Sequence, residues 1–455
     1  MEDFLHRLSG YLWAGVPLGD SGLIIPLLLG LLLGIGIYLT LGLRFLTWRK
    51  LFHAFRLLFS RDETLKAGEI SSFQALMTAL SATVGTGNIA GVATAIVLGG
   101  PGAIFWMWIT ALFGMATKYA EALLAVRYRE VDSKGHYVGG PMYYIKNGLA
   151  GHWHWLATAF ALFGAIAGLG IGNMVQANSV AHAVDSAFQL PPALTGAVLA
   201  VLVAFVIIGG IKRIAAIATG LVPLMTFSYI ACAMIVIAMH WHQILPTLGL
   251  IIDSAFTGTA ASGGFVGASV WAAIRFGVAR GVFSNEAGLG SAPIAHAAAK
   301  TDDPVRQGLI AMLGTFIDTI IICTMTALVI LLTGVWTNGE NGAALSNAAF
   351  VDGLGDFGAT VVTIGLVLFA FTTLLGWSYY GERCAQYVFG IRIVLPYRIL
   401  WVLVIPLGAM GKLETVWLLA DVMNGLMAIP NLIALALLSS IVFHMTKLHF
   451  GKRAG

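Results

Sequence analysis

Charged residues are scarce in this sequence of 455 residues: they make up 10% of the chain, whereas hydrophobic residues make up 58%. Soluble domains typically carry roughly 25% charged residues, and a soluble fold could not bury so much apolar surface. The hydrophobic residues fall in runs of about 18 to 28, each long enough to cross a bilayer as a helix. We therefore expect one transmembrane domain over residues 1–455, without a soluble appendage.

Cysteine is also rare, and its three copies, Cys232, Cys323 and Cys384, lie far apart inside apolar runs. No C-x-x-C pair or adjacent histidine accompanies them, which argues against a metal site. The net charge of +4 is small, and no basic cluster is interleaved with exposed aromatic residues. We therefore expect no nucleic-acid partner.

Several catalytic and nucleotide-binding motifs are missing as well. The sequence contains no G-x-x-x-x-G-K-[ST], no H-E-x-x-H and no G-x-S-x-G. These absences argue against an ATP-driven pump and against an intramembrane enzyme, and we expect no cofactor. A channel would need a polar face along many spans, whereas the polar residues within the spans gather in two places.

Long apolar stretches predict an all-α membrane protein with about eleven transmembrane helices. We place them near residues 22–43, 73–98, 101–127, 154–184, 193–210, 214–240, 260–295, 306–334, 357–389, 395–411 and 415–443.

Lysine and arginine occur in every second joint between these spans. The joints at 99–101, 185–192, 241–259 and 335–356 contain neither residue, and of 25 basic residues only Arg7 and Lys412 fall on that side. Because short cytoplasmic loops are rich in Lys and Arg, we expect the N-terminus outside and the C-terminus in the cytoplasm. The protein is then a multi-pass protein of a bacterial or archaeal cytoplasmic (inner) membrane, and 335–356 is a polar loop on its outer side.

Two spans are polar and glycine-rich at their centres, where hydrocarbon should forbid an irregular backbone. The first contains Val84-Gly85-Thr86-Gly87-Asn88, and the second runs from Arg275 to Gly290. Close packing of small residues is the simpler explanation for a lone G-x-x-x-G, but amide and charged side chains stand beside these glycines. We interpret both as broken helices, whose free N–H and C=O groups can hold an anionic group and a cation.

The positions of the two breaks suggest an internal repeat. They fall in the second and seventh spans, five spans apart, as expected of a five-plus-five inverted repeat preceded by an extra N-terminal helix. We expect the extra helix at 22–43, the first repeat at 73–240 and the second at 260–443.

The third span of each predicted repeat carries further polar residues. Gln176 can donate to a carboxylate, Thr372 and Thr373 can offer hydroxyl oxygens to a cation, and Trp377 can wall a small side chain. For any one of them a helix-to-helix hydrogen bond is the simpler role, but their matched placement favours a shared site.

Several motifs closely resemble the alanine or glycine:cation symporter family, the sodium:alanine symporters. The similar stretches are Thr78 to Gly91, Gly99 to Gly102, Gly114 to Glu121, Gly139 to Ile145, Arg280 to Pro293 and Trp377 to Glu382. The resemblance implies a leucine-transporter-like fold, in which 84–88 is similar to the broken first core helix.

The resemblance also implies roles for individual residues. Gly85, Thr86 and Gly87, with Asn88 and Gln176, would hold the carboxylate and amino group of an amino acid. Phe276 or Phe283, with Thr373 and Trp377, would shape the pocket. Ser81, Val84, Thr372 and Thr373 are candidates for one sodium site.

Charged residues inside the spans leave alternatives open. Lys118 and Glu121 stand three apart, which favours an ion pair on one helix face. Arg280 and Glu286 flank the second break, where they could form a gate, pair with each other in a structural role or contact the substrate. Asp318 is alone in an apolar span, where it could be protonated or bind a cation.

Together these features predict a sodium-coupled symporter that imports a small neutral amino acid, alanine or glycine, by alternating access. The alternative is a proton-coupled transporter of the same fold, in which Asp318 or Glu121 would carry the proton. We expect the amino acid, sodium and membrane lipid as partners, and no obligatory protein partner.

Overall fold

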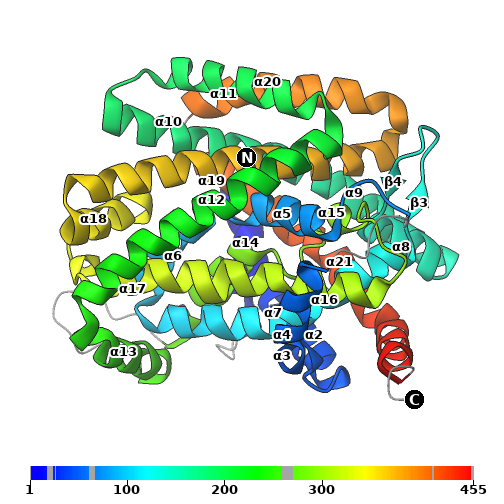
Figure 1. Ribbon diagram of the computed structural model, residues 1–455, viewed down its shortest axis with the longest axis horizontal. Helices are drawn as coiled ribbons and strands as arrows, with labels where there is room; N and C mark the ends of the chain where they lie inside the picture. The colour runs from blue at the N-terminus through cyan, green and yellow to red at the C-terminus, as the bar shows by residue number, and fades with distance from the viewer. Residues whose placement is uncertain are drawn as a thin grey trace.

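The computed structural model describes residues 2–17, 24–25, 27–60, 67–257, 270–411 and 414–451. Helices run mainly along the long axis of the molecule in Figure 1. In the first half the elements are α1 (Glu2–Ser9), η1 (Gly10–Ala14), β1 (Val16–Pro17), β2 (Ile24–Ile25), α2 (Leu27–Gly42), α3 (Leu46–Arg49), α4 (Leu51–Leu58), α5 (Ser72–Thr83), η3 (Gly87–Gly91), α6 (Val92–Gly99), α7 (Gly102–Arg127), β3 (Glu130–Val131), β4 (Tyr137–Val138), α8 (Pro141–Gly148), η4 (Gly151–Trp153), α9 (His154–Ala167), η5 (Gly168–Met174), α10 (Val175–Phe188), α11 (Pro192–Ile207) and α12 (Gly210–Met239).

The second half continues with helical segments throughout its described part. They are η6 (Trp241–Gln243), α13 (Ile244–Thr257), α14 (Val270–Asn285), α15 (Pro293–His296), α16 (Pro304–Thr315), η7 (Phe316–Cys323), α17 (Thr324–Leu332), η8 (Val335–Thr337), α18 (Gly342–Leu354), α19 (Asp356–Phe389), η9 (Ile391–Ile393), α20 (Val394–Met410) and α21 (Glu414–Gly451).

Each expected span overlaps a helix in the described part of the chain. Seven helical stretches there are long and apolar enough to cross a membrane, or eight if the bent pair Ser72–Thr83 and Gly87–Gly99 counts as one span. Helices α2, α11 and α14 have 16 residues each, or roughly 24 Å at the usual rise, which is short of a hydrocarbon core. The protein is therefore a mostly helical, multi-pass membrane protein, and the count of about eleven stays a prediction.

Within the described residues, two small hairpins depart from an all-α chain. Strands β1 and β2 pair antiparallel, as do β3 and β4, with two residues in each strand. Asp132 stabilises the second hairpin, because its Oδ1 accepts hydrogen bonds from the backbone N–H groups of Lys134 and His136 at 2.8 and 2.9 Å.

The expectation of a polar loop at 335–356 is wrong, since α18 and η8 occupy most of it. Asn341 caps α18, and its Oδ1 accepts a hydrogen bond from the N–H of Gly342 at 2.6 Å. Leu345, Ala349 and Phe350 are buried on one face, which explains why this polar sequence still packs as a helix.

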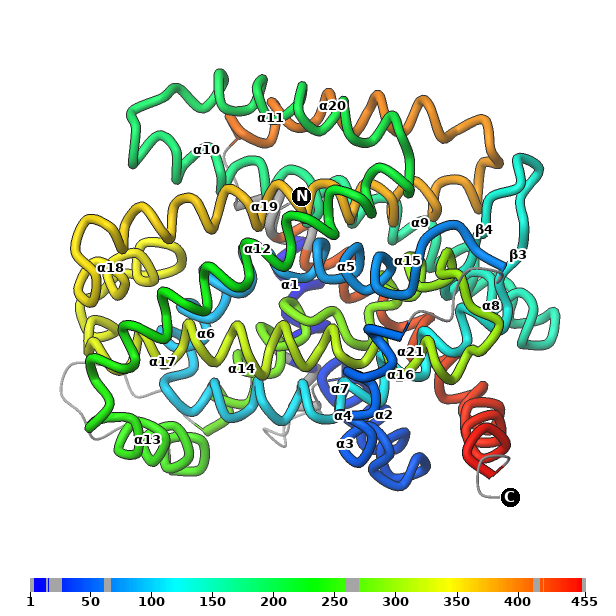
Figure 2. Tube along the Cα trace, in the orientation of Figure 1, coloured from blue at the N-terminus to red at the C-terminus, as the bar shows by residue number. Residues whose placement is uncertain are grey.

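The centre of the molecule is built from helices that are far apart in the sequence. Helix α7 packs against α14 and α16, while α19 packs against α5, α9, α10 and α12. Helices α11 and α20 pack on each other and form an outer layer of the tube in Figure 2. Turns and short helices lie at the two ends, with α13 and α18 at one end and α8 with the β3–β4 hairpin at the other (Figure 1).

Candidate functional site

The chain bends sharply between α5 and η3. Helix α5 ends at Thr83, and the helical path resumes at Gly87 at an angle of 56°. Helix α19 passes very close to this bend: a Cβ atom at Gly85 would lie 2.6 Å from Thr373 Oγ1. Glycine is therefore the residue that allows the two backbones to approach.

A buried cavity lies beside this bend. Its volume is about 10 Å³, which is room for about one water molecule. The structure brings most of the predicted substrate residues to it: Gly85, Thr86, Gly87, Gln176, Phe283, Thr373 and Trp377. Ala82, Thr83, Ile171 and Glu286 complete its lining.

Two polar atoms in this lining are available to a ligand. Thr86 Oγ1 and Gln176 Oε1 are buried and have no hydrogen-bond partner among the described residues. Gln176 is fixed in place because its Nε2 donates to the carbonyl of Ile171 at 3.1 Å. Buried polar atoms without partners are costly, so their presence on one cavity indicates that something polar binds there.

Asn88 does not line the cavity, although it was grouped with the substrate residues. Its Oδ1 accepts from the N–H of Gly85 at 2.9 Å, and its Nδ2 donates to Asp318 Oδ1 at 2.7 Å. The side chain therefore connects the bend to η7. These bonds position the bend, and a direct contact of Asn88 with substrate stays a prediction.

Asp318 accepts this hydrogen bond from Asn88. The sequence indicated an isolated carboxylate at 318 but not which residue it contacts. Its Oδ2 accepts hydrogen bonds from Ser284 Oγ at 2.7 Å and from Thr319 Oγ1 at 2.8 Å, and the carboxylate is fully buried. It lies in the π-helical segment η7, and such segments are frequent at functional sites. The available signal was a single carboxylate in an apolar span, which is by default a functional hypothesis.

Phe276 lies away from the small cavity, in a second one of about 100 Å³ that also contains Arg275, Arg280 and Asp421. Phe276 and Phe283 are two helical turns apart on α14, roughly 10 Å along the helix, so only Phe283 reaches the bend. Phe283 lines both cavities. Its ring therefore stands between them.

The four candidate sodium residues lie on α5, directly after it and on α19, and these two helices pack against each other; Thr372 Oγ1 also lies 3.7 Å from Met225 Sδ on α12. Ser81, Val84, Thr372 and Thr373 are all buried. Ser81 Oγ donates to the carbonyl of Thr78 at 2.8 Å, and the hydroxyls of Thr372 and Thr373 both donate to the carbonyl of Phe369, at 3.0 and 2.9 Å. Each hydroxyl oxygen keeps lone pairs with which it could coordinate a cation.

The second irregular segment follows α14. Glu286 adopts a left-handed conformation with φ of 55°, and Gly288 and Gly290 also have positive φ. The chain then enters the short helix α15 rather than a second membrane-length half. This segment is a long turn, and it differs from the bend at Gly85.

Glu286 is the cavity residue that sequence reasoning left undecided. Its carboxylate accepts from Trp377 Nε1 at 2.8 Å and from Ser291 Oγ. Within the described part of the chain it forms no ion pair with Arg280, whose guanidinium lies over the Phe283 ring at 5.7 Å.

Lys118 and Glu121 also differ from expectation, since they do not pair with each other. Lys118 Nζ donates to the backbone carbonyl of Glu286 at 3.2 Å. Glu121 Oε1 accepts from Asn431 Nδ2 at 2.7 Å and from the N–H of Gly290 at 3.1 Å. Both side chains point from α7 into the second irregular segment, because its free backbone groups need buried partners.

Known proteins resemble this chain over nearly all of its length. A family model described as the sodium:alanine symporter family matches residues 16–454. The sodium/alanine symporter AgcS of Methanococcus maripaludis is 56% identical over 431 residues, covering 93% of this chain and 94% of that protein. An uncharacterized transporter of Haemophilus influenzae is 52% identical over 453 residues, covering 99% and 96%.

A more distant relative and a solved structure extend the comparison. The probable sodium/glutamine symporter GlnT of Bacillus subtilis is 42% identical over 423 residues, covering 92% of this chain and 87% of that protein. The crystal structure of a manganese transporter from Eremococcus coleocola has a TM-score of 0.50 at 15% identity, covering 84% of this chain and 81% of that chain, so the two share a fold. The family and these relatives are transporters and not enzymes. The chain belongs to the sodium:alanine symporter family.

Proposed function

We propose that this protein is a sodium-coupled symporter that imports alanine or glycine across a cytoplasmic (inner) membrane by alternating access. The observation that carries the proposal is the small buried cavity at the bend, with the unpartnered Thr86 Oγ1 and Gln176 Oε1 in its wall. The sodium/alanine symporter AgcS, 56% identical over 431 residues, supports both the substrate and the ion.

The groups around the cavity can bind both ends of a small zwitterion, once the cavity widens beyond the about 10 Å³ of this structure. The N–H groups at the start of η3 can hold a carboxylate, since a helix N-terminus favours negative charge. The carboxylate of Glu286 and the hydroxyl of Thr373 can accept from the ammonium group. Phe283, Ile171 and Trp377 supply apolar wall, which would favour the small apolar side chain of alanine or the absence of one in glycine.

Two places can hold the coupling cation. The first is the α5–α19 contact with Ser81, Val84, Thr372 and Thr373. The second is the buried carboxylate of Asp318, which Asn88 connects directly to the backbone of Gly85. Because a hard cation such as sodium prefers oxygen ligands and a negative charge, Asp318 is the stronger of the two candidates. Its link to Gly85 would make substrate binding and cation binding depend on each other.

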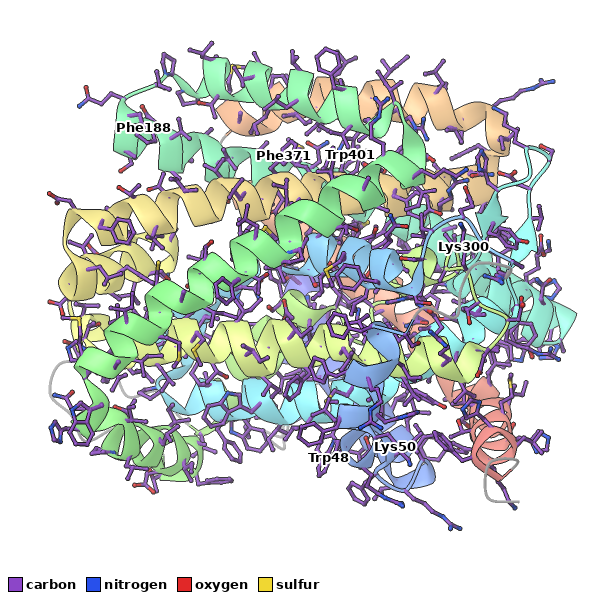
Figure 3. All side chains as sticks on the ribbon, in the orientation of Figure 1. Trp48, Lys50, Phe188, Lys300, Phe371 and Trp401 are labelled. Atoms are coloured by element: carbon purple, nitrogen blue, oxygen red, sulfur yellow. The ribbon has the colours of Figure 1, made fainter. Side chains whose placement is uncertain are left out.

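The proposed topology has an extra helix at 22–43, one repeat at 73–240 and an inverted second repeat at 260–443. Residues 258–269 at the start of the second repeat lie outside the described residues. The N-terminus would be outside and the C-terminus cytoplasmic. The two kinds of joint lie at opposite ends of the molecule, as this topology requires. Lys300, from a joint with basic residues, lies at the end with the β3–β4 hairpin, and Phe188, from the joint 185–192 without them, lies at the other end (Figure 3).

The test is uptake of radiolabelled alanine into proteoliposomes under an imposed sodium gradient and, separately, under a proton gradient. We expect uptake to follow the sodium gradient, and Asp318→Asn to remove that dependence because it removes the buried charge. Asp352→Asn, on the exposed side of α18, is the matched control and should behave as the unchanged protein.

Two outcomes would contradict the proposal. Uptake that follows only the proton gradient would replace the coupling ion. No uptake of alanine or glycine under either gradient, from protein that is folded by size-exclusion chromatography, would remove the substrate class.

A further inference from the structure

A separate cavity lies at the end of the molecule that carries the β3–β4 hairpin. Its volume is about 210 Å³. It is lined by Glu69, His136, Arg383, Arg398 and residues 208–212, where α11 joins the start of α12. It shares no lining residue with the cavity at the bend. In the proposed orientation, on which this inference depends, it faces the cytoplasm.

The charge that is free inside this cavity is positive. Its one carboxylate, Glu69, is already engaged: Oε2 contacts His136 Nδ1 and Oε1 accepts from the N–H of Tyr137, both at 2.9 Å. Lys212 is exposed and has no hydrogen-bond or ion-pair partner among the described residues. Such a cavity favours an anionic ligand.

The two arginines are held in place by a carboxylate outside the cavity lining. Glu382 Oε2 accepts from Arg398 Nε at 2.5 Å, and Glu382 Oε1 lies 3.4 Å from Arg383 Nη2. Arg383 is nearly fully buried; its Nη1 donates to Gln386 Oε1 and lies 3.7 Å from Asp132 Oδ2, whereas its Nε has no hydrogen-bond partner within the described part of the chain. Pre-arranged guanidinium groups of this kind match the oxygen atoms of a phosphoryl group.

The surroundings of the cavity are apolar and exposed. Ile208 is 67% exposed and itself lines the cavity, and Phe205, one turn earlier, is also 67% exposed. On the neighbouring helix α20, Leu395 and Ile399 flank Arg398 and are 64% and 52% exposed. Helices α11 and α20 pack against each other as the outer layer (Figure 2), so in a membrane protein these side chains face lipid tails.

A cationic cavity that opens beside a lipid-facing apolar surface has a specific occupant in a membrane. Basic pockets between transmembrane helices on the cytoplasmic side bind the head groups of acidic lipids. We propose that this cavity binds the phosphoryl head group of an anionic phospholipid, whose acyl chains lie along α11 and α20. A soluble phosphate would use the same cations but would gain nothing from the apolar flank.

Native mass spectrometry of the full-length protein in detergent tests this proposal without any need for transport. The protein is titrated with phosphatidylglycerol and with phosphatidylcholine, and the phosphatidylglycerol series is repeated with excess inorganic phosphate. We expect phosphatidylglycerol to be retained in preference, and Lys212→Gln to weaken its binding about five-fold, the usual effect of one lysine near an acidic head group.

Lys447→Gln is the matched control, because Lys447 is an exposed lysine on α21 that does not line the cavity. It should leave lipid binding unchanged. Equal retention of the two lipids, or equal losses in the two variants, would overturn the proposal. Displacement of phosphatidylglycerol by inorganic phosphate would overturn the lipid assignment and leave a site for soluble anions. Each of these results is independent of whether alanine is transported.

Discussion

The two irregular segments of the membrane core differ in length and in how their backbone is stabilised. At the first, three residues separate α5 from η3, and a single amide, Asn88, bridges the gap from Gly85 to Asp318. At the second, seven residues separate α14 from α15, and partners from α7 and α21 satisfy the exposed backbone.

This difference supports the proposal that the first segment binds ligands and the second holds the structure together, although Glu121 Oε2 beside the second segment also has no hydrogen-bond partner among the described residues. The first leaves Thr86 Oγ1 and, opposite it, Gln176 Oε1 without partners. The second engages the carbonyls of Glu286 and Gly288 and the N–H of Gly290 in bonds to Lys118, Asn431 and Glu121. Glu286 alone belongs to both, since its backbone is part of the scaffold and its carboxylate faces the cavity.

The largest expected effect comes from Gly290→Ala in the second segment. Gly290 has φ of 80°, and an added Cβ would lie 2.6 Å from Pro141 Cγ and 2.8 Å from Phe160 Cε2. Backbone strain and overpacking together cost about 3 kcal/mol, so we expect a large fall in the melting temperature of the purified protein. Gly339→Ala is the control, because its φ is 88° but nothing lies within 4 Å of the new atom. Equal shifts in the two variants would show that packing at Gly290 is unimportant.

An intermediate effect is expected for Asn88→Ala in the first segment. The change leaves the N–H of Gly85 and Asp318 Oδ1 without their present partner, which weakens the link between the bend and η7. We expect the sodium concentration that half-saturates alanine binding to rise by about ten-fold or more, measured by scintillation proximity at fixed alanine.

Asn173→Ala is the comparison for that change. Asn173 is equally buried, and its Nδ2 donates to the carbonyl of Trp401 at 2.8 Å, away from the bend. This variant should lose stability while keeping the sodium dependence of the unchanged protein. If the sodium dependence shifts alike in both variants, Asn88 has a structural role only.

The smallest effect is expected for Gly85→Ala. The new methyl group would lie 2.6 Å from Thr373 Oγ1 without any strain from positive φ, so we expect alanine affinity to fall about five-fold, or about 1 kcal/mol. The same clash should lower the melting temperature, and adding Thr373→Ala, which removes the clashing atom, should restore it. The double variant tests the contact directly: no recovery of stability would mean that Gly85 is required for another reason.

Much of the fold follows from the sequence because lipid imposes a simple rule. Every backbone polar group in the hydrocarbon needs an internal partner, so apolar runs predict the helices, and the glycine-rich stretch at 84–88 predicts the bend. The same reasoning fails in 335–356, because the apolar face of α18 is short and is covered by Tyr229 and other residues distant in the chain.

The sequence indicated which residues form the candidate site but not where their side chains point. Glycine and threonine at the bend indicate a binding segment, whereas the side of the helix that Asn88 occupies depends on Asp318, 230 residues away. Phe276 and Phe283 stand on the same helical face, and only the level at which α14 meets the bend decides which ring reaches the cavity. Glu286 was visible as an unusual charge, but its neighbour Trp377 is 91 residues further along the chain.

The small size of the cavity at Gly85 has a further consequence when no substrate is bound. A space of about 10 Å³ cannot hold a column of water, so an ion travelling alone would have to shed its hydration. That penalty is several kcal/mol, more than the roughly 2.3 kcal/mol that 100 mV of membrane potential supplies to one charge. If sodium is the coupling ion, as proposed, the protein without substrate would act as an insulator, and the sodium gradient would not run down through it.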